Sequence, residues 1–308
     1  MKCIITDAQK RFVLSDVSAP EPARSEALIT VQAVSMNRGE LRFAAAMKPG
    51  FRPGWDYAGV VLKAGEKGPQ AGARVVGIRP DFGAWAEQIT ANPSDFAMIP
   101  DGVSSEIAAA LPTAGLTALY ALERAGGLVG RRVLITGASG GVGHFACQLA
   151  KMAGAEVVGL SRSKEAASFL RKLDVGQIVE SAEPQAAASY GPFDLILESV
   201  GGSSLGQSVG LLAPKGLCVA FGVTAGKTAE IDVLDFYRQG RRLEGFGVFQ
   251  ELAAKSAAEG LARLLRLVVQ GRLHVQLGAV ESWTEVSAIA EKMQARAYDG
   301  KAILRVGV

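Results

Sequence analysis

The sequence predicts a mixed α/β protein with two parts, a mostly-β domain and a domain built on a parallel sheet. Short apolar segments separated by glycine and proline fill the first 112 or so residues, as in a barrel-like β domain. From Pro112 onward, apolar strand-like runs alternate with helical stripes, which is typical of a parallel sheet covered by helices. The stretch 135–163 within this second part combines a strand, a glycine-rich turn, a helix and a second strand.

The first part contains six segments with the β-branched and alternating apolar residues of strands. Gly and Pro residues separate them, and two of these, Pro20 and Pro22, precede the third segment. Strands are predicted at Lys2–Thr6, Phe12–Val17, Ala27–Met36, Asp56–Ala64, Arg74–Ile78 and Ala84–Thr90.

The stretch 135–163 has the pattern of a phosphate-binding unit. Arg132–Thr136 reads as a buried strand, and Glu156–Leu160 as its parallel neighbour. Four glycines and a helix with an apolar face lie between them: Gly137, Gly140, Gly141 and Gly143, then Phe145, Leu149 and Met152. Glycines let the backbone approach a pyrophosphate, whose charge is stabilised by the free N–H groups at a helix start. The context therefore predicts dinucleotide binding, with Ser139, Gly140, Gly141 and Val142 as contacts.

The remaining elements extend the parallel sheet and then return to β structure. Strands are predicted at Phe193–Leu197, Leu217–Phe221, Val275–Val280 and Lys301–Val306, and helices at about 252–269 and around Val286, Ile289, Ala290 and Met293. Val200 and the pair Phe221-Gly222 end successive strands at the carboxyl edge of the sheet. Ligands of open α/β sheets bind at that edge, so these three residues are predicted cofactor contacts, although the glycines are also needed for the turns themselves.

Composition limits the classes of function. The 308 residues are 49% hydrophobic and 20% charged with a net charge of +3, and no basic block or apolar run of eighteen residues occurs. Neither nucleic-acid binding nor a membrane span is expected. The three cysteines, Cys3, Cys147 and Cys218, lie far apart in apolar segments, and the first residues lack a signal-peptide pattern. We therefore expect free buried thiols and a cytoplasmic location.

A family resemblance rests on motifs spread over nearly the whole chain. These are VSMNRGELR (34–42), RPGWDYAGVV (52–61), GARVVGI (72–78), AAALPTAGLTALYAL (108–122), ITGASGGVG (135–143), FDLILESVGG (193–202) and GKAIL (300–304). In sequence and order they resemble a zinc-independent medium-chain dehydrogenase/reductase of the quinone oxidoreductase type. The resemblance implies a GroES-like catalytic domain at 1–112, completed by 250–308, and a Rossmann NADP(H)-binding domain at 113–249. It further implies a cofactor cleft between the domains.

Relatives of this type are often homodimers that meet at the edge of the Rossmann sheet. The segments Leu217–Phe221 and Phe246–Phe249 are the predicted places for that contact.

The glycine turn also fits the T-G-x-x-x-G-x-G pattern of short-chain dehydrogenases. Those proteins carry it near the N-terminus and use a Tyr-x-x-x-Lys pair. Here a β domain precedes the turn, and no tyrosine has a lysine four residues later, so this family is excluded.

The residues after the second strand of the cofactor unit favour NADP(H). An NAD site usually places Asp or Glu there to bind the ribose hydroxyls. This chain has Ser161, Arg162 and Ser163, which suit a 2′-phosphate through hydroxyl and guanidinium groups. The alternative is a solvated loop in which Ser163 caps the following helix.

No zinc site is expected. Zinc-dependent relatives use a Cys near the position of Asn37 and a His at the position of Trp55, and no cysteine lies between Cys3 and Cys147. The two histidines, His144 and His274, stand far from any ligand cluster.

Chemistry without a Lewis acid favours an acceptor that is already electrophilic. Hydride transfer to a quinone or an α,β-unsaturated carbonyl needs only modest stabilisation of the developing negative charge. The resemblance puts Asn37 opposite the nicotinamide and Thr117 beneath it. Tyr57 is a candidate donor near the substrate, unless it simply packs the β domain. Phe246 is predicted to line the cleft, and Lys301 to reach the cofactor phosphates.

Two further functions stay open. One is a low-turnover NADPH-binding protein with a structural or regulatory role, as among crystallin-like relatives. The other is a zinc-free alcohol or aldehyde reductase. In each case the partner is a small molecule, and water is an open alternative to a side chain as proton donor.

Overall fold

The computed structural model describes residues 1–307 as two compact units. Unit 1 comprises Met1–Leu116 and Leu252–Val308, and unit 2 comprises Thr117–Glu251. The chain passes from the first to the second within helix α3 (Pro112–Glu123) and returns at the end of helix α8 (Val248–Leu252). The sequence analysis divided the chain at slightly different residues, into 1–112 with 250–308, and 113–249.

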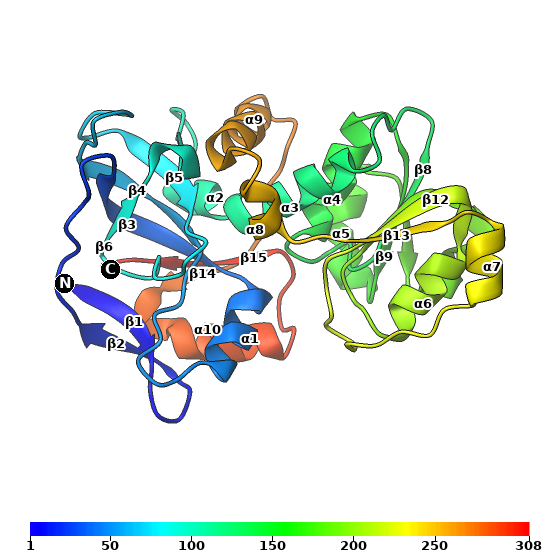
Figure 1. Cartoon of the computed structure of the whole chain (residues 1–308), viewed down its shortest axis with the longest axis horizontal. Coiled ribbons are helices and arrows are strands. Elements are labelled where there is room, and N and C mark those ends of the chain that lie inside the picture. Colours follow the sequence, from blue (N-terminus) through cyan, green and yellow to red (C-terminus); the bar gives the residue numbers. More distant parts are fainter. Residues whose placement is uncertain (308) are drawn as a thin grey trace. The chain divides into compact units, whose positions relative to one another are not determined.

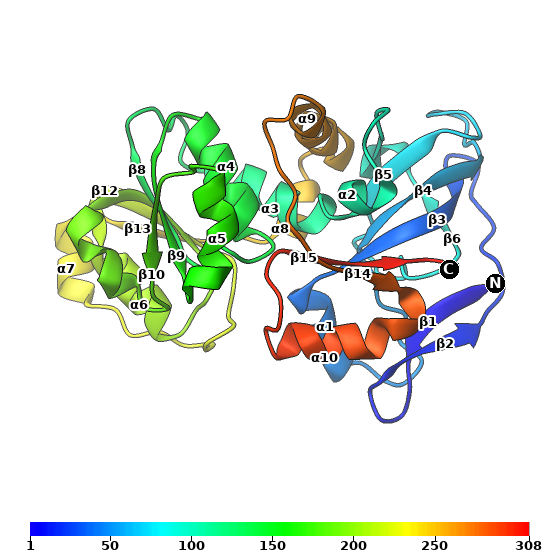
Figure 2. The same ribbon diagram turned by 180° about the vertical axis from the view of Figure 1, so that it is seen from behind.

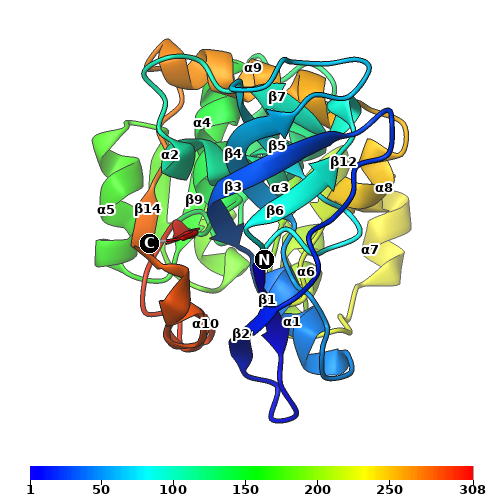
Figure 3. The same ribbon diagram turned by 90° about the vertical axis from the view of Figure 1, so that its left-hand side faces the viewer.

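Unit 1 is built on a seven-stranded mixed sheet and a two-stranded antiparallel one. The smaller sheet pairs β1 (Lys2–Thr6) with β2 (Phe12–Asp16). The larger has the order β14-β15-β3-β4-β5-β7, with β6 also paired to β3, and only β14 and β15 run parallel. Its strands are β3 (Ala27–Met36), β4 (Asp56–Lys63), β5 (Arg74–Ile78), β6 (Gln88–Ala91), β7 (Phe96–Met98), β14 (Leu277–Ser282) and β15 (Lys301–Arg305). Figure 3 shows β3, β4 and β5 side by side.

Several helices belong to unit 1 along with its two sheets. They are α1 (Arg38–Ala46), η1 (Pro93–Asp95), α2 (Ser105–Ala109), α9 (Ala257–Val269), η3 (Trp283–Glu285) and α10 (Val286–Gln294). The four apolar residues predicted on one face of α10 are the four that it buries: Val286, Ile289, Ala290 and Met293. They join the core that lies under β1, β3 and β4.

Unit 2 is a six-stranded, fully parallel sheet with the order β10-β9-β8-β11-β12-β13. Numbered within the unit, this order is 3-2-1-4-5-6, the Rossmann arrangement. The strands are β8 (Arg132–Ile135), β9 (Glu156–Ser161), β10 (Gln177–Glu180), β11 (Phe193–Glu198), β12 (Leu212–Ala220) and β13 (Arg242–Gly245). The strand order turns round between β8 and β11, and ligands of such sheets bind at that point.

Helices cover both faces of the unit 2 sheet. They are α4 (Gly143–Met152), α5 (Lys164–Lys172), η2 (Pro184–Tyr190), α6 (Ser203–Gly210) and α7 (Val233–Arg238), besides α3 and α8. In Figures 1 and 2, α4 and α5 lie on one face and α6 and α7 on the other. Together the two units confirm the predicted α/β fold class.

Three sequence predictions differ from the structure. The strand predicted at Ala84–Thr90 begins only at Gln88. The N–H groups of Ala84 and Trp85 donate to Gly54 O and Pro53 O in a loop, and Ala86 makes only an isolated antiparallel bridge with Cys3 of β1. The helix predicted at 252–269 is two helices, since the Ser256 hydroxyl caps a new start for α9.

The third difference concerns the sheet edge. Leu217–Phe221 is the predicted contact strand, yet β12 pairs with β11 on one side and β13 on the other. The edge strands are β10 and, next to β12, β13. The sequence analysis missed β13 because RLEG is short and carries two charges.

No helix within the described residues is both long enough and apolar enough to cross a membrane.

Candidate functional site

The glycine turn of unit 2 is a tightly packed connection between β8 and α4. Gly137 adopts a left-handed φ of 61°, and the N–H of Ala138 donates to Leu160 O at 2.8 Å. A Cβ on Gly143 would lie 2.2 Å from Gly137 O and 2.7 Å from the Cα of Ala138. Only glycine therefore allows α4 to begin this close to the turn, which is the packing that the sequence pattern predicts.

The start of α4 suits an anion. Its N-cap is Val142, whose side chain makes no capping hydrogen bond, and its first turn carries no acidic residue. The N–H groups of a first helical turn have no intrahelical acceptors, and the helix dipole adds partial positive charge there. Ser139, Gly140, Gly141 and Val142 form this turn, and Ser139 is buried within it. These residues fit a dinucleotide pyrophosphate.

The turns that follow β8 and β11 are joined where the strand order reverses. The N–H of Ser199 donates to the Thr136 hydroxyl at 2.9 Å, and the Ser199 hydroxyl donates to Thr136 O at 2.9 Å. Gly137 belongs to the same contact, because a Cβ there would lie 2.8 Å from Ser199 Oγ. The predicted contacts at the glycine turn and at Val200 are thus neighbours.

Glu198 is a structural residue of this site that sequence reasoning missed. Its fully buried carboxylate accepts hydrogen bonds from Val200 N at 3.1 Å, Gly201 N at 2.8 Å and the Ser204 hydroxyl at 2.8 Å. The carboxylate thereby shapes the loop after β11. Its place at the end of an apolar strand, just before two glycines, is the signal that could have found it.

The loops after β11 and β12 also meet. Ala225 N donates to Val200 O at 2.8 Å, and Phe221 N donates to Glu198 O at 2.9 Å. A Cβ on Gly222 would lie 1.9 Å from Ser199 O, so the glycine is required by this backbone approach. The structure therefore brings Val200, Phe221 and Gly222 together at the carboxyl edge.

The serines after β9 have structural tasks, and the arginine between them is exposed. The Ser163 hydroxyl accepts a hydrogen bond from Ala166 N at 3.1 Å and caps α5. Ser161 is buried and donates to Ser163 O at 3.3 Å. The capping alternative for Ser163 is thus what the structure shows, and Arg162 is the residue of the three whose side chain faces solvent.

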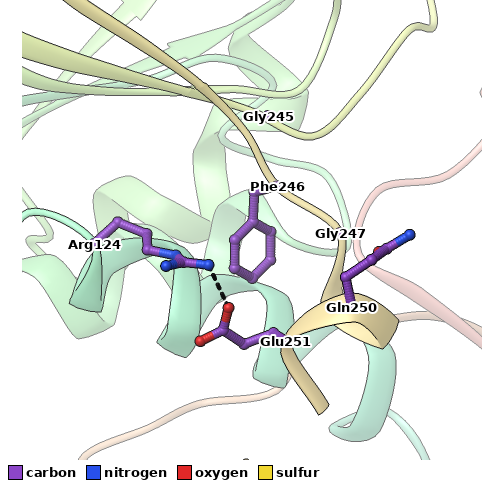
Figure 4. A pocket seen from close by; sticks show the side chains of 6 residues that line it. All are labelled: Arg124, Gly245, Phe246, Gly247, Gln250 and Glu251. Carbon is purple, nitrogen blue, oxygen red and sulfur yellow. Dashed lines mark hydrogen bonds and ion pairs between the residues drawn. The ribbon is translucent and has the colours of Figure 1, made fainter. Parts of the chain in front are cut away.

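Phe246 lines a cavity of about 400 Å³ at the end of β13. Figure 4 shows its ring beside Arg124, whose guanidinium lies 5.8 Å from the ring centroid. Arg124 is paired with Glu251 at 2.5 Å and with Glu244 at 3.2 Å. Because two carboxylates neutralise this arginine, the cavity does not present a free cation to an anionic ligand.

Unit 1 contains a buried polar cluster around Asn37, which we call the Asn37 cluster: Asn37, Glu40, Asp56, Thr113 and Lys301. Asn37 is the N-cap of α1 and follows directly after β3. Its Nδ2 donates to Asp56 Oδ2 at 2.8 Å, and its Oδ1 accepts from Lys301 Nζ at 2.5 Å. Lys301 Nζ also lies 3.6 Å from Asp56 Oδ2. The cluster brings β4, β15 and the start of α1 together.

Glu40 adds a second buried carboxylate to the cluster. It accepts from Trp55 N at 2.5 Å and Asn37 N at 2.6 Å, and it is fully buried. Burial, together with the charge of Asp56, raises the pKa of Glu40 to about 8, against the lowering effect of those two hydrogen bonds and of Lys301.

Asp56 and Lys301 are the other two ionisable residues of the Asn37 cluster. Thr113 donates to Asp56 Oδ1 through its N–H at 2.9 Å and its hydroxyl at 2.5 Å. Burial lowers the pKa of the Lys301 ammonium, and the two carboxylates oppose that change. Sequence analysis found Asn37 and Lys301 but missed their partners. Asp56 and Thr113 come from segments distant in sequence, whereas the Asn37-x-x-Glu40 spacing of a capping box was a local signal for Glu40.

Two predicted roles in unit 1 do not fit the geometry. Tyr57 is fully buried in the core, and its hydroxyl lies against Gly77 without a hydrogen-bond partner. It packs the sheet, as the alternative held, and is not presented to a substrate. Lys301 is 2% exposed, and its ammonium is engaged by Asn37, Met36 O and Asp56. It is therefore not available to the cofactor phosphates.

Thr117 lies buried on α3, at the first residue of unit 2. Its predicted place beneath the nicotinamide stays a prediction.

The side chains do not fit a zinc ion. Within residues 1–307, no group of three or more His, Cys, Asp or Glu side chains could hold a metal. Trp55 is buried against Phe82 where zinc-dependent relatives have a ligating His, with ring centroids 5.1 Å apart. His144 lies under the glycine turn, its Nδ1 3.0 Å from Gly140 O.

Comparisons with known proteins agree on one family. Residues 141–266 match the family described as zinc-binding dehydrogenase. The structure resembles the quinone oxidoreductase of Coxiella burnetii with a TM-score of 0.86 and 30% identity, over 99% of both chains. It also resembles the quinone oxidoreductase of Thermus thermophilus, solved alone and with NADPH, with a TM-score of 0.86 and 28% identity over 99% and 100% of the two chains.

A chloroplast envelope quinone oxidoreductase homolog of Arabidopsis thaliana is 34% identical over 57% of this chain and 58% of its own length. The chain spans between 15% and 59% of the length of three curated relatives that it matches.

The fold, the glycine turn and these likenesses define the class of protein as that of the two-domain dehydrogenases and reductases with a Rossmann unit. It belongs to the medium-chain dehydrogenase/reductase family, in the quinone oxidoreductase group.

Proposed function

We propose that the protein is a zinc-independent reductase that uses NADPH to reduce a quinone or an α,β-unsaturated carbonyl. The observation that carries this proposal is the pairing of an uncapped α4 start with a basic, acid-free tip on β9. The Val142 side chain does not cap the start of α4, where a pyrophosphate can bind, and the residues 161–163 carry no carboxylate. The first feature suits the pyrophosphate of either nicotinamide dinucleotide, and the second favours the dinucleotide with an additional 2′-phosphate.

Arg162 is the proposed determinant of NADPH preference. Ser161 and Ser163 have their hydroxyls engaged within the loop, whereas the Arg162 side chain is exposed at its tip. A guanidinium can bind a 2′-phosphate through two parallel hydrogen bonds. The quinone oxidoreductase of Thermus thermophilus was solved in complex with NADPH, which supports the same cofactor for this protein.

The acceptor class follows from the groups that unit 1 offers. Bound NADPH supplies a hydride, two electrons with one proton, to an electrophilic carbon or oxygen. The Asn37 cluster offers an amide N–H and no Lewis acid, which suits an acceptor whose negative charge is spread over an enolate or phenolate. The reductases of quinones and of acryloyl-coenzyme A among the relatives support an acceptor of this kind.

Steady-state kinetics with purified protein test the proposal. NADPH and NADH oxidation would be followed with a panel of benzoquinones, enones and aldehydes, before and after treatment with a zinc chelator. We expect turnover with quinones or enones, a preference for NADPH and no effect of the chelator. Tight NADPH binding without turnover on the whole panel would instead indicate a cofactor-binding protein with a structural or regulatory role.

The variant Arg162→Ala tests the cofactor assignment separately. Loss of a charge-assisted contact worth about 1.5–3 kcal/mol should weaken NADPH binding by about 10- to 100-fold and leave NADH binding unchanged. Lys227→Ala, in the loop before α7, is the control cation. An unchanged ratio of NADPH to NADH affinity in Arg162→Ala would contradict the assignment.

A further inference from the structure

The amide of Asn37 is fixed by two groups of opposite kind. Lys301 carries only hydrogen-bond donors and contacts Oδ1 at 2.5 Å, while the Asp56 carboxylate accepts from Nδ2 at 2.8 Å. A flipped amide would set its NH₂ group against the ammonium and its oxygen against the carboxylate. The cluster therefore permits one of the two amide orientations.

The two groups that hold Asn37 are themselves immobile. Asp56 and Lys301 are buried. Thr113 fixes the other carboxylate oxygen of Asp56 through two hydrogen bonds, and Met36 O lies 3.4 Å from Lys301 Nζ. Side chains with so many fixed partners cannot follow Asn37 if it rotates, so they determine where its amide points.

One donor of the cluster remains available. A side-chain amide has two N–H bonds, and Nδ2 of Asn37 uses one of them on Asp56. Within residues 1–307 we find no hydrogen bond for the second. Asn37 is also more exposed than Glu40, Asp56 and Lys301, the charged groups of the cluster, which are all buried.

We propose that Asp56 and Lys301 are positioning residues that aim this second N–H of Asn37 at the oxygen of the acceptor. The inference rests on the proposed function. Hydride from NADPH reduces the acceptor by two electrons, and its oxygen becomes negative and then takes a proton from water. Asn37 keeps its own protons and stabilises that negative charge by a hydrogen bond, which the ammonium on Oδ1 strengthens by polarising the amide.

A double-mutant cycle on the binding of an oxyanion tests this without turnover. The probe is 4-nitrophenolate, titrated into the protein saturated with NADP⁺ and followed by its absorbance. Asn37→Ala should weaken phenolate binding by about 10- to 100-fold, the loss typical of a hydrogen bond to a charged group. Lys301→Met should weaken it in the presence of Asn37 and have no further effect in the Asn37→Ala background.

The same cycle is then measured on turnover. Loss of one donor to a developing oxyanion lowers kcat by about 10²- to 10³-fold, and we expect this for Asn37→Ala with the NADPH affinity unchanged. Lys301→Met should lower kcat less, by about 10²-fold at most, since the donor remains but is misplaced. Arg305→Met, which removes an exposed cation from the same strand, is the control and should leave kcat unchanged.

Removing Lys301 alone leaves the Asp56 carboxylate buried without its counter-ion, which can prevent folding. Lys301→Met is therefore also made together with Asp56→Asn, which keeps both shapes and removes one charge of each sign. The new amide has one oxygen and can accept from Asn37 or from the Thr113 N–H, but not from both. Urea unfolding therefore checks that this double variant is folded, and the folded variant should still show the weakened phenolate binding.

The outcomes separate the two proposals. Phenolate affinity that is absent, or equal in the wild type and Asn37→Ala, overturns the positioning role whatever the turnover. If Lys301→Met weakens phenolate binding equally with and without Asn37, the lysine does not act through Asn37, and the positioning role is also overturned. Loss of all turnover on the acceptor panel overturns the proposed function, and the phenolate cycle remains readable in that case.

Discussion

At the scale of single residues, Glu40 makes the stability of the protein depend on pH. Its pKa rises from an ordinary 4.5 to about 8 in the folded protein. Between these values the folded state holds a proton that the unfolded chain has released. The contribution of Glu40 to the free energy of unfolding is therefore fully present below pH 4.5 and is lost as pH rises towards 8, by about 1.4 kcal/mol per pH unit at most.

Urea unfolding at pH 5, 6, 7 and 8, followed by tryptophan fluorescence, measures this slope. Glu40→Gln should lower stability at each pH, because one of the two N–H donors loses its acceptor, but it should remove the Glu40 share of the slope. Glu281→Gln, on the exposed side of β14, is the matched control and should keep the slope. An equal slope in wild type and Glu40→Gln would show that Glu40 is ionised throughout.

Single residues were predictable from sequence where a local pattern places them. Gly143 stands in a turn whose spacing alone requires a glycine, and the structure shows the backbone that a Cβ would meet. Tyr57 and Lys301 had no such local signal. Whether an alternating strand residue faces the core or a polar cluster depends on which strands lie beside it, and β15 reaches β3 from the far end of the chain.

At the scale of elements, the close packing of α4 on the glycine turn predicts the effect of Gly143→Ala. The added Cβ would meet backbone atoms of Gly137 and Ala138, so the turn must shift. Such overpacking costs about 1–3 kcal/mol, and the displaced N–H groups should weaken NADPH binding by at least about 10-fold. Gly127→Ala, where nothing lies within 4 Å, is the control. Thermal unfolding and NADPH titration measure both effects, and normal NADPH affinity in Gly143→Ala would contradict the assigned role of the turn.

Elements with strong periodicity were predictable, and elements whose form depends on their neighbours were not. The buried face of α10 could be read from its spacing alone. In contrast, β13 has no apolar run, and pairing with β12 makes it a strand. The segment 84–87 is apolar like a strand but lies across Gly54, whose missing side chain gives room to Trp85.

At the scale of the whole molecule, the edge of the parallel sheet predicts an assembly. Among the described strands, β13 pairs with β12 alone, so one side of its backbone remains open to another chain. Four large apolar side chains on β13 and α7 are exposed: Val233 at 68%, Leu234 at 48%, Tyr237 at 63% and Leu243 at 39%. We propose a homodimer in which two β13 strands meet, which differs from the sequence-based expectation only in the strand concerned.

Light scattering after size exclusion measures the mass of the particle and so tests this assembly. We expect a dimer for the wild type and a monomer for the double variant Val233→Lys and Leu243→Lys, because all the introduced charges have the same sign and repel one another across a two-fold contact. Val269→Lys, an equally exposed apolar position on α9 of unit 1, is the matched control and should stay dimeric. A monomeric wild type, or a dimer that survives the double variant, would place the contact elsewhere or remove it. Since the changed residues belong to α7 and β13 and not to the glycine turn, the monomeric variant should retain NADPH binding.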